Sequence, residues 1–332
     1  MKFEYLHTSD RDKHLSRLVH PIFIEDIHKN LKNCANFIKF INLNKGVKTW
    51  FIFSDYCLDD KEKPNNVMTF TILALKNQAE FNLIGKVINA LQKTDIKKSK
   101  IINPQFLEFI SRLPIFNISF ILPDKSNFIK PYLIDEIEFF KIRFKSLENF
   151  YSRMLSFPVQ EKYYIDCIKD FQYIQKKFES KSISLYLYRN IEILNSAVST
   201  IFTLISSVDP NTDYNLTWVS DRDSMLTFEK SNLSAPLIFS MISASFYSLS
   251  KSNNQLAFYD HKSAGTPDLD HFNRIPDMIA GTLADMSKTA VSKEKFLTVL
   301  KLYLVNQRQN HIVKFHFESD KYGLNTLILS KK

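Results

Sequence analysis

The stretch VKTWFIFSDYCLDDKEKPNNVMTFTILAL, residues 47–75, contains two runs rich in β-branched and aromatic residues. The first run covers residues 47–54, the second covers residues 67–75, and a polar segment that contains Pro64 separates them. Such runs on either side of a turn-rich segment are typical of a β-hairpin. The stretch therefore predicts two antiparallel strands, the first of which is followed directly by Asp55.

The patterns outside this hairpin predict further strands and helices in alternation. Strands are expected at residues 115–122, 214–220, 255–260, 311–318 and 324–330, and helices at residues 81–112 in two pieces that separate near Pro104, and at 135–155, 160–178, 183–206, 235–250, 275–287 and 294–309. An antiparallel start followed by late β-α-β-α alternation predicts an α/β fold with a sheet of mixed strand direction.

The domain organisation follows from the same pattern. Residues 1–46 form a basic, partly helical N-terminal segment, and residues 47–290 form the central α/β domain. This domain carries a helical insertion at about residues 135–206. Residues 291–332 add a C-terminal extension of one helix and one hairpin.

Composition favours a folded protein with a polyanionic partner. Of the 332 residues 45% are hydrophobic, and the formal net charge is +9, which favours nucleic acid as a partner. The codon usage of an AT-rich genome produces the same excess of Lys, Asn, Ile and Phe. The basic balance alone is therefore weak support for nucleic acid.

The cysteines and the absence of an apolar leader predict a cytoplasmic protein. Three cysteines occur without a CxxC pair, which favours a reducing compartment over a disulfide framework or a zinc site. The N-terminus is polar where a signal peptide has an apolar segment. Seven serines dilute the uncharged stretch at residues 231–250, which predicts a buried helix capped by Ser234 rather than a membrane span.

Glycine placement excludes several classes of enzyme. The five glycines are too dispersed for a phosphate-binding P-loop, a dinucleotide-binding fingerprint or a kinase glycine loop. The chain also has no GxSxG or HExxH motif.

Four aspartates form the candidate site because they follow strand-like runs or open a predicted helix. Asp55 follows the first strand, Asp221 and Asp223 follow the strand at residues 214–220, and Asp277 begins the helix at residues 275–287. Carboxylates held rigidly at such positions suit hard divalent cations. Each position also has a structural interpretation. Asp55 could form a turn, Asp221 and Asp223 could form an ion pair or a turn with Arg222 between them, and Asp277 could cap its helix.

The order of these elements resembles the ribonuclease H-like superfamily. More closely, PDMIAGTLADM at residues 276–286 is similar to the late-helix signature of a widespread prokaryotic ribonuclease H-like family of unknown function. The first strand of that family ends in Asp-Glu-Ser-Gly, whereas this chain has Asp55, Tyr56 and Cys57 after Ser54. The resemblance spans residues 47–290 and implies a ribonuclease H-like mixed sheet flanked by helices, with the insertion and the extension added.

The resemblance implies a metal-dependent nuclease that hydrolyses phosphodiester bonds of DNA or RNA with two Mg²⁺ or Mn²⁺ ions. It assigns Asp55, Asp221 and Asp277 as catalytic residues, and Asp55, Asp221, Asp223 and Asp277 as metal ligands. Glu136 and Glu138 are the candidates for a helix glutamate.

Two other classes stay open. The missing Glu and Gly of the first motif favour a non-catalytic module that kept the fold and binds nucleic acid or a partner protein. The many phenylalanines favour a structural or interaction subunit if a large apolar patch is exposed.

Overall fold

Strands β1 (Thr49–Cys57) and β2 (Asn66–Leu75) form the antiparallel hairpin that the sequence predicts. Almost every residue in both strands is buried, as expected for runs of apolar residues. β1 continues past its predicted end because Asp55 is opposite Thr69, and Cys57 is opposite Val67, in the ladder. Asp55 therefore lies inside the strand rather than after it, which corrects the prediction.

The sheet has seven strands in the order β5-β4-β1-β2-β3-β6-β7. β1 is parallel to β4, β4 to β5 and β3 to β6, whereas β2 is antiparallel to β1 and β3, and β7 is antiparallel to β6. The strands not yet given are β3 (Ile115–Leu122), β4 (Asn215–Ser220), β5 (Gln255–Asp260), β6 (Asn310–Glu318) and β7 (Lys321–Leu327). This arrangement confirms the predicted α/β class with a mixed sheet.

The computed structural model describes residues 21, 23–96, 98–122, 135–156, 160–180, 183–221, 223–229, 231–250, 254–260, 267–287, 290–318 and 321–330. The first 20 residues of the predicted basic segment lie outside this range. The helices are α2 (Ile24–Lys32), α3 (Ala35–Leu43), α4 (Gln78–Leu91), α5 (Pro104–Ile110), α6 (Glu136–Met154), α7 (Glu161–Glu179), α8 (Leu185–Ser206), α9 (Ser224–Thr227), α10 (Leu237–Leu249), α11 (Pro267–Asp285), α12 (Glu294–Val299) and the π-helical η2 (Leu300–Leu304).

Two predicted helices differ from the observed ones. α11 begins at Pro267, so Pro276 and Asp277 lie inside the helix and do not open it. Proline is disfavoured inside helices because it lacks an amide hydrogen, and it is favoured in the first turn, where the prediction placed Pro276. The helix predicted for residues 294–309 ends earlier, because α12 passes into η2 and the chain then turns into β6.

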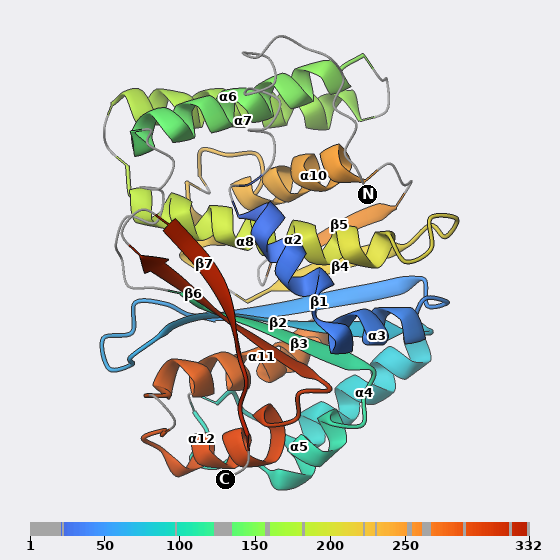
Figure 1. The fold of residues 1–332 in the computed structure, drawn as a ribbon. Coiled ribbons are helices and arrows are strands. Elements are labelled where there is room, and N and C mark those ends of the chain that lie inside the picture. Colours follow the sequence, from blue (N-terminus) through green and yellow to red (C-terminus); the bar gives the residue numbers. More distant parts are fainter. Residues whose placement is uncertain are drawn as a thin grey trace. The chain divides into compact units, whose positions relative to one another are not determined.

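The chain divides into two compact units. The first consists of residues 1–25, 132–200 and 224–251, and the second consists of residues 26–131, 201–223 and 252–332. The second unit contains all seven strands, together with α3, α4, α5, α11 and α12 (Figure 1). Most of the predicted helical insertion falls in the first unit.

Within the second unit, helices cover both faces of the sheet. The ring of Phe272 in α11 stacks on Phe53 of β1 with a centroid distance of 4.9 Å. On the opposite face, Phe40 of α3 meets Trp50 of β1 edge-on at 5.8 Å. Because side chains alternate along a strand, Asp55 and Cys57 share the α11 face with Phe53, whereas Tyr56 shares the α3 face with Trp50.

Within the first unit, the start of α10 differs from its prediction. Pro236 occupies the N-cap position, and Ser234 instead donates its backbone amide and its hydroxyl group to the carboxylate of Asp170 in α7 at 3.1–3.2 Å. These hydrogen bonds hold the segment before α10 against α7.

Among the described residues, no helix is both long and apolar enough to cross a membrane.

Candidate functional site

Asp55 is a buried carboxylate in the middle of the sheet. Its side chain is 6% exposed, and Oδ1 accepts a hydrogen bond from the backbone amide of Tyr56 at 2.5 Å. The ladder places it opposite Thr69, whose hydroxyl group bonds to that of Ser119 at 3.0 Å. Asp55 thus begins a row of polar side chains that crosses three strands on the face that α11 covers.

Asp221 and Asp223 lie at the end of β4, beside the end of β1. The backbone amide of Asp221 donates to the carbonyl oxygen of Ser54 at 3.0 Å, which continues the parallel pairing of β4 with β1 by one residue. The structure therefore brings the backbone of Asp221 next to that of Asp55. Asp223 is close enough for its charge to act on the hydroxyl group of Tyr56.

A buried set of hydroxyl groups fastens β1 to β4 on the α3 face. The Tyr56 hydroxyl group bonds to Ser54 Oγ at 2.7 Å and to Ser220 Oγ at 2.8 Å, and Trp218 Nε1 donates to Ser54 Oγ at 2.9 Å. Burial raises the pKa of the Tyr56 hydroxyl group well above its ordinary value, and the negative charges of Asp223 and Asp55 add to the rise. Tyr56 therefore stays neutral and acts as a structural link.

Asp277 has a backbone partner in the loop between α4 and α5. Its Oδ2 atom accepts a hydrogen bond from the amide of Ile96 at 2.9 Å, and the side chain is 8% exposed. This bond explains a buried carboxylate inside a helix, because an unsatisfied amide at this point would be costly. Asp277 lies on the wall of a cavity that the end of β1 also lines.

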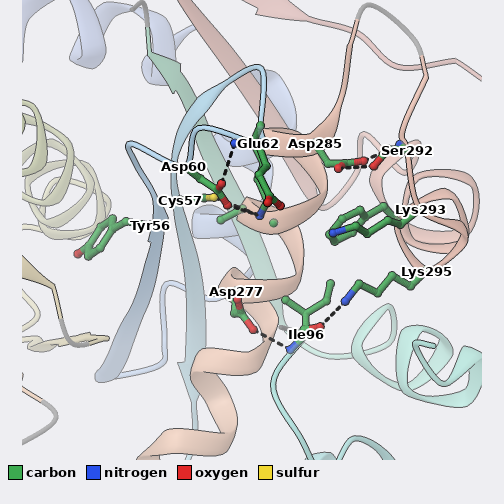
Figure 2. A pocket seen from close by; sticks show the side chains of 14 residues that line it. Tyr56, Cys57, Asp60, Glu62, Ile96, Asp277, Asp285, Ser292, Lys293 and Lys295 are labelled. Carbon is green, nitrogen blue, oxygen red and sulfur yellow. Dashed lines mark hydrogen bonds and ion pairs between the residues drawn. The ribbon is translucent and has the colours of Figure 1, made fainter. Parts of the chain in front are cut away.

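The cavity has a volume of about 290 Å³ and lies entirely within the second unit (Figure 2). Five segments surround it: the end of β1, the β1–β2 loop, the α4–α5 loop, α11, and the start of α12 with the residues just before it. The lining residues are Tyr56, Cys57, Asp60, Glu62, Lys63, Ile96, Asp277, Ala280, Gly281, Asp285, Ser292, Lys293, Lys295 and Phe296. Figure 2 shows the ring of Tyr56 pointing away from the cavity, so this residue contributes its backbone.

Three lysines surround one aromatic ring at this cavity. The Nζ atoms of Lys63, Lys293 and Lys295 lie 5.8, 6.0 and 5.3 Å from the ring centroid of Phe296. A cation over an aromatic face is stabilised by the ring quadrupole, which offsets part of the repulsion between like charges. Burial and the positive charge of Lys293 lower the pKa of Lys295.

Two of these lysines have partners of their own. Lys295 Nζ donates to the carbonyl oxygens of Ile96 at 2.6 Å and Ser99 at 2.8 Å. Lys63 Nζ donates to Cys57 Sγ at 3.2 Å and lies 3.8 Å from an Asp60 carboxylate oxygen. These contacts hold both ammonium groups at the wall of the cavity.

Asp285 serves the fold at the far end of α11. Its carboxylate accepts two hydrogen bonds from Ser292, one from the backbone amide at 2.6 Å and one from the hydroxyl group at 2.7 Å. The bonds hold the segment that carries Lys293 and Lys295 against α11. Figure 2 shows this contact near the side chain of Lys293.

The four predicted aspartates do not assemble as a metal centre. Among the residues that the structure describes, no group of three or more His, Cys, Asp or Glu side chains is arranged to hold a metal ion. Asp55 and Asp277 are buried and each accepts a backbone amide, while Asp221 and Asp223 lie beyond the end of β4. The two-metal site that the resemblance implies stays a prediction.

Glu136 and Glu138, the candidates for a helix glutamate, both lie in the first turn of α6 in the first unit. Glu136 forms a bidentate ion pair with Arg189 of α8. The helix directly before β4 instead contains Glu192, a buried residue that the sequence analysis missed and that pairs with Arg143 at 2.8 Å. Its position in the helix before β4 was the one signal for Glu192 in the sequence, because its partner Arg143 lies in another helix.

The sequence analysis also missed the cavity lysines. Lys293 and Lys295 belong to the short run SKEKF at residues 292–296, which looks like an ordinary solvated helix start. They meet Lys63 at the ring of Phe296 although Lys63 lies in the distant β1–β2 loop, and no local pattern records such a contact.

Comparison of the chain with family models, curated proteins and solved structures finds no match.

Proposed function

We propose that this chain is a nucleic-acid-binding module and that the three-lysine cavity holds a backbone phosphate. The observation that carries the proposal is the convergence of Lys63, Lys293 and Lys295 on the ring of Phe296. Three ammonium groups in one place repel each other, and a phosphate between them relieves that repulsion. Lysine is a common ligand of phosphate groups because it presents a compact charge with three donors.

The acidic residues at the cavity are consistent with this function. Asp277 and Asp285 each accept backbone amides, and Asp60 lies beside Lys63. Asp277 and Asp285 thus already have hydrogen-bond donors in the protein, and Asp60 has a cation beside it, while Glu62 is the fourth acidic residue that lines the cavity. Lys293 projects from the exposed start of α12, where its Nζ atom has the aromatic ring as its neighbour, so it is the lysine best placed to meet an incoming phosphate.

The sheet supports a ribonuclease H-like framework for this module. An antiparallel β1–β2–β3 meander is followed by α8, by β4 parallel to β1, and by a late helix, α11, that packs on β1. This is the order of strands and helices on which the resemblance rests, with α4 and α5 added between β2 and β3, and with Asp55 and Asp277 inside their elements rather than at the ends. The net charge of +9 adds the general attraction to a polyanion that such binding uses.

The Lys293→Ala variant tests the phosphate contact. We expect it to weaken binding to a labelled single-stranded oligonucleotide by about three- to tenfold at about 0.1 M salt, because one ammonium–phosphate contact is lost. The slope of log K against log salt should become shallower by about 0.7. Fluorescence anisotropy over a salt series with DNA and with RNA measures both quantities.

Lys39→Ala is the matched control for this experiment. Lys39 is an exposed lysine of α3, on the opposite face of the sheet from the cavity, and its removal changes the net charge by the same amount. We expect the slope of this variant to equal that of the unmodified chain. Equal losses in the two variants would mean that binding follows net charge and that the cavity holds no phosphate.

Metal-dependent hydrolysis of nucleic acid is the second candidate function. The backbone contact between the ends of β1 and β4, which places Asp221 beside Asp55, favours it. Under the binding proposal, the protein leaves DNA and RNA intact in Mg²⁺ or Mn²⁺. The control variant is Asp213→Asn, which changes an exposed residue before β4. If the protein cleaves nucleic acid, and if Asp55→Asn loses this activity while Asp213→Asn keeps it, the protein is a nuclease and the binding proposal is wrong.

A further inference from the structure

Cys57 and Lys63 form a thiol–amine pair at the wall of the cavity. Cys57 is the last residue of β1, and the β1–β2 loop brings Lys63 back so that its Nζ atom donates to Cys57 Sγ at 3.2 Å. Cys57 is 8% exposed, and the side chain of Lys63 is 12% exposed. The two reactive atoms are therefore in direct contact and largely shielded from bulk water.

The same cavity gives a small oxidant a route to the pair. Both residues line the space of about 290 Å³, which is ample for a molecule of the size of hydrogen peroxide. Lys63 is also one of the three lysines around Phe296. Chemistry at Cys57 thus acts directly on a charge of the proposed phosphate site.

We propose that peroxide oxidation joins Cys57 to Lys63 and thereby weakens phosphate binding at the cavity, an inference whose second half rests on the proposed function. In the first step the thiol reduces hydrogen peroxide to water and becomes a sulfenic acid. In the second step the lysine nitrogen attacks the sulfur, the S–O bond breaks, and water and one proton leave. The product is an S–N bond, and the ammonium charge of Lys63 is gone.

The other two cysteines have different surroundings. Cys167 lies against the hydroxyl groups of Tyr163 and Tyr151, and burial raises the pKa of its thiol to about 12. Cys34 occupies the N-cap position of α3 without a side-chain cap hydrogen bond, and burial raises the pKa of its thiol. Among the described residues, Cys57 is the cysteine whose sulfur has a lysine as its hydrogen-bond partner, so the other two thiols are internal controls.

Peptide mapping tests the cross-link without reference to binding. Trypsin separates Cys57, in residues 49–61, from Lys63, in residues 62–76. After treatment of the folded full chain with hydrogen peroxide, we expect these two peptides to be joined, with a mass about 2 Da below their sum, and to separate again on reduction with a thiol. Recovery of Cys57 only as a sulfinic or sulfonic acid would overturn the inference.

The binding assay tests the consequence, with each protein compared with itself before and after peroxide. We expect cross-linking to weaken oligonucleotide binding by about three- to tenfold and a thiol reductant to restore it. In Cys57→Ser, peroxide should leave the affinity unchanged, since the sulfur atom of the bond is missing. If the cross-link forms fully but binding is unaltered, Lys63 has no role in phosphate binding, although the cross-link itself is established. Failure of the cross-link and failure of the phosphate site therefore give different results.

Discussion

The Arg143→Met variant is expected to lose about 3–5 kcal/mol of its free energy of unfolding at pH 8, because it leaves a carboxylate buried without its counter-charge. Arg143 of α6 and Glu192 of α8 are both almost fully buried and meet through one hydrogen bond of 2.8 Å, from Nε to Oε1. Glu192 Oε2 accepts no hydrogen bond from the residues that the structure describes. The carboxylate therefore depends strongly on the charge of Arg143.

The loss should also depend on pH. Burial raises the pKa of Glu192, while the charge and hydrogen bond of Arg143 lower it. Without Arg143 the folded-state pKa rises further above the unfolded value. A raised folded-state pKa gives stability that is present below the unfolded pKa and lost as pH rises through the folded pKa, so the variant should be less impaired at pH 5 than at pH 8.

Urea denaturation followed by circular dichroism at both pH values measures the effect. The control is Lys145→Met on the same helix. The side chain of Lys145 is half-exposed and pairs with Glu148 at 2.7 Å, so its loss should lower the free energy of unfolding by about 0–1 kcal/mol. A double variant, Arg143→Met with Glu192→Leu, should regain most of the loss because no buried charge remains. An Arg143→Met loss no larger than that of Lys145→Met would show that the pair contributes little.

The regular elements follow from local sequence in most of the chain. Runs such as IFNISFIL form a strand over the predicted residues 115–122, because β-branched and aromatic side chains suit a pleated sheet covered on both faces. The break near Pro104 is also present: Asn103 caps α5 and Pro104 occupies its first turn. These features depend on neighbours in sequence, which is why a single chain reveals them.

The site was harder to predict because its contacts join distant segments. Asp277 bonds to Ile96, and Lys295 bonds to the carbonyl groups of Ile96 and Ser99, across more than 180 residues. No local pattern records such pairs. Asp277 also lies inside α11 because packing against β1 stabilises a helix that contains Pro276, and tertiary packing here outweighs the local preference of proline.

The Phe272→Ala variant is expected to lose about 3–5 kcal/mol of the free energy of unfolding of the second unit, because it removes a ring from the contact between α11 and the sheet. Phe272 is 1% exposed and stacks on Phe53 at 4.9 Å and on Phe81 at 4.6 Å. α11 also carries Asp277 and Gly281 at the cavity wall, so the same ring helps to hold the site together.

Leu83→Ala on α4 is the control for this variant, since Leu83 is 63% exposed and its removal should change stability by less than about 0.5 kcal/mol. Urea denaturation measures both variants. Because Phe272 and Arg143 belong to different compact units, a chain that unfolds in two steps should show each variant shifting a different transition. If Phe272→Ala and Leu83→Ala unfold at the same urea concentration, the stacked rings do not anchor α11, and the cavity must owe its shape to the backbone bonds of Asp277 and Asp285.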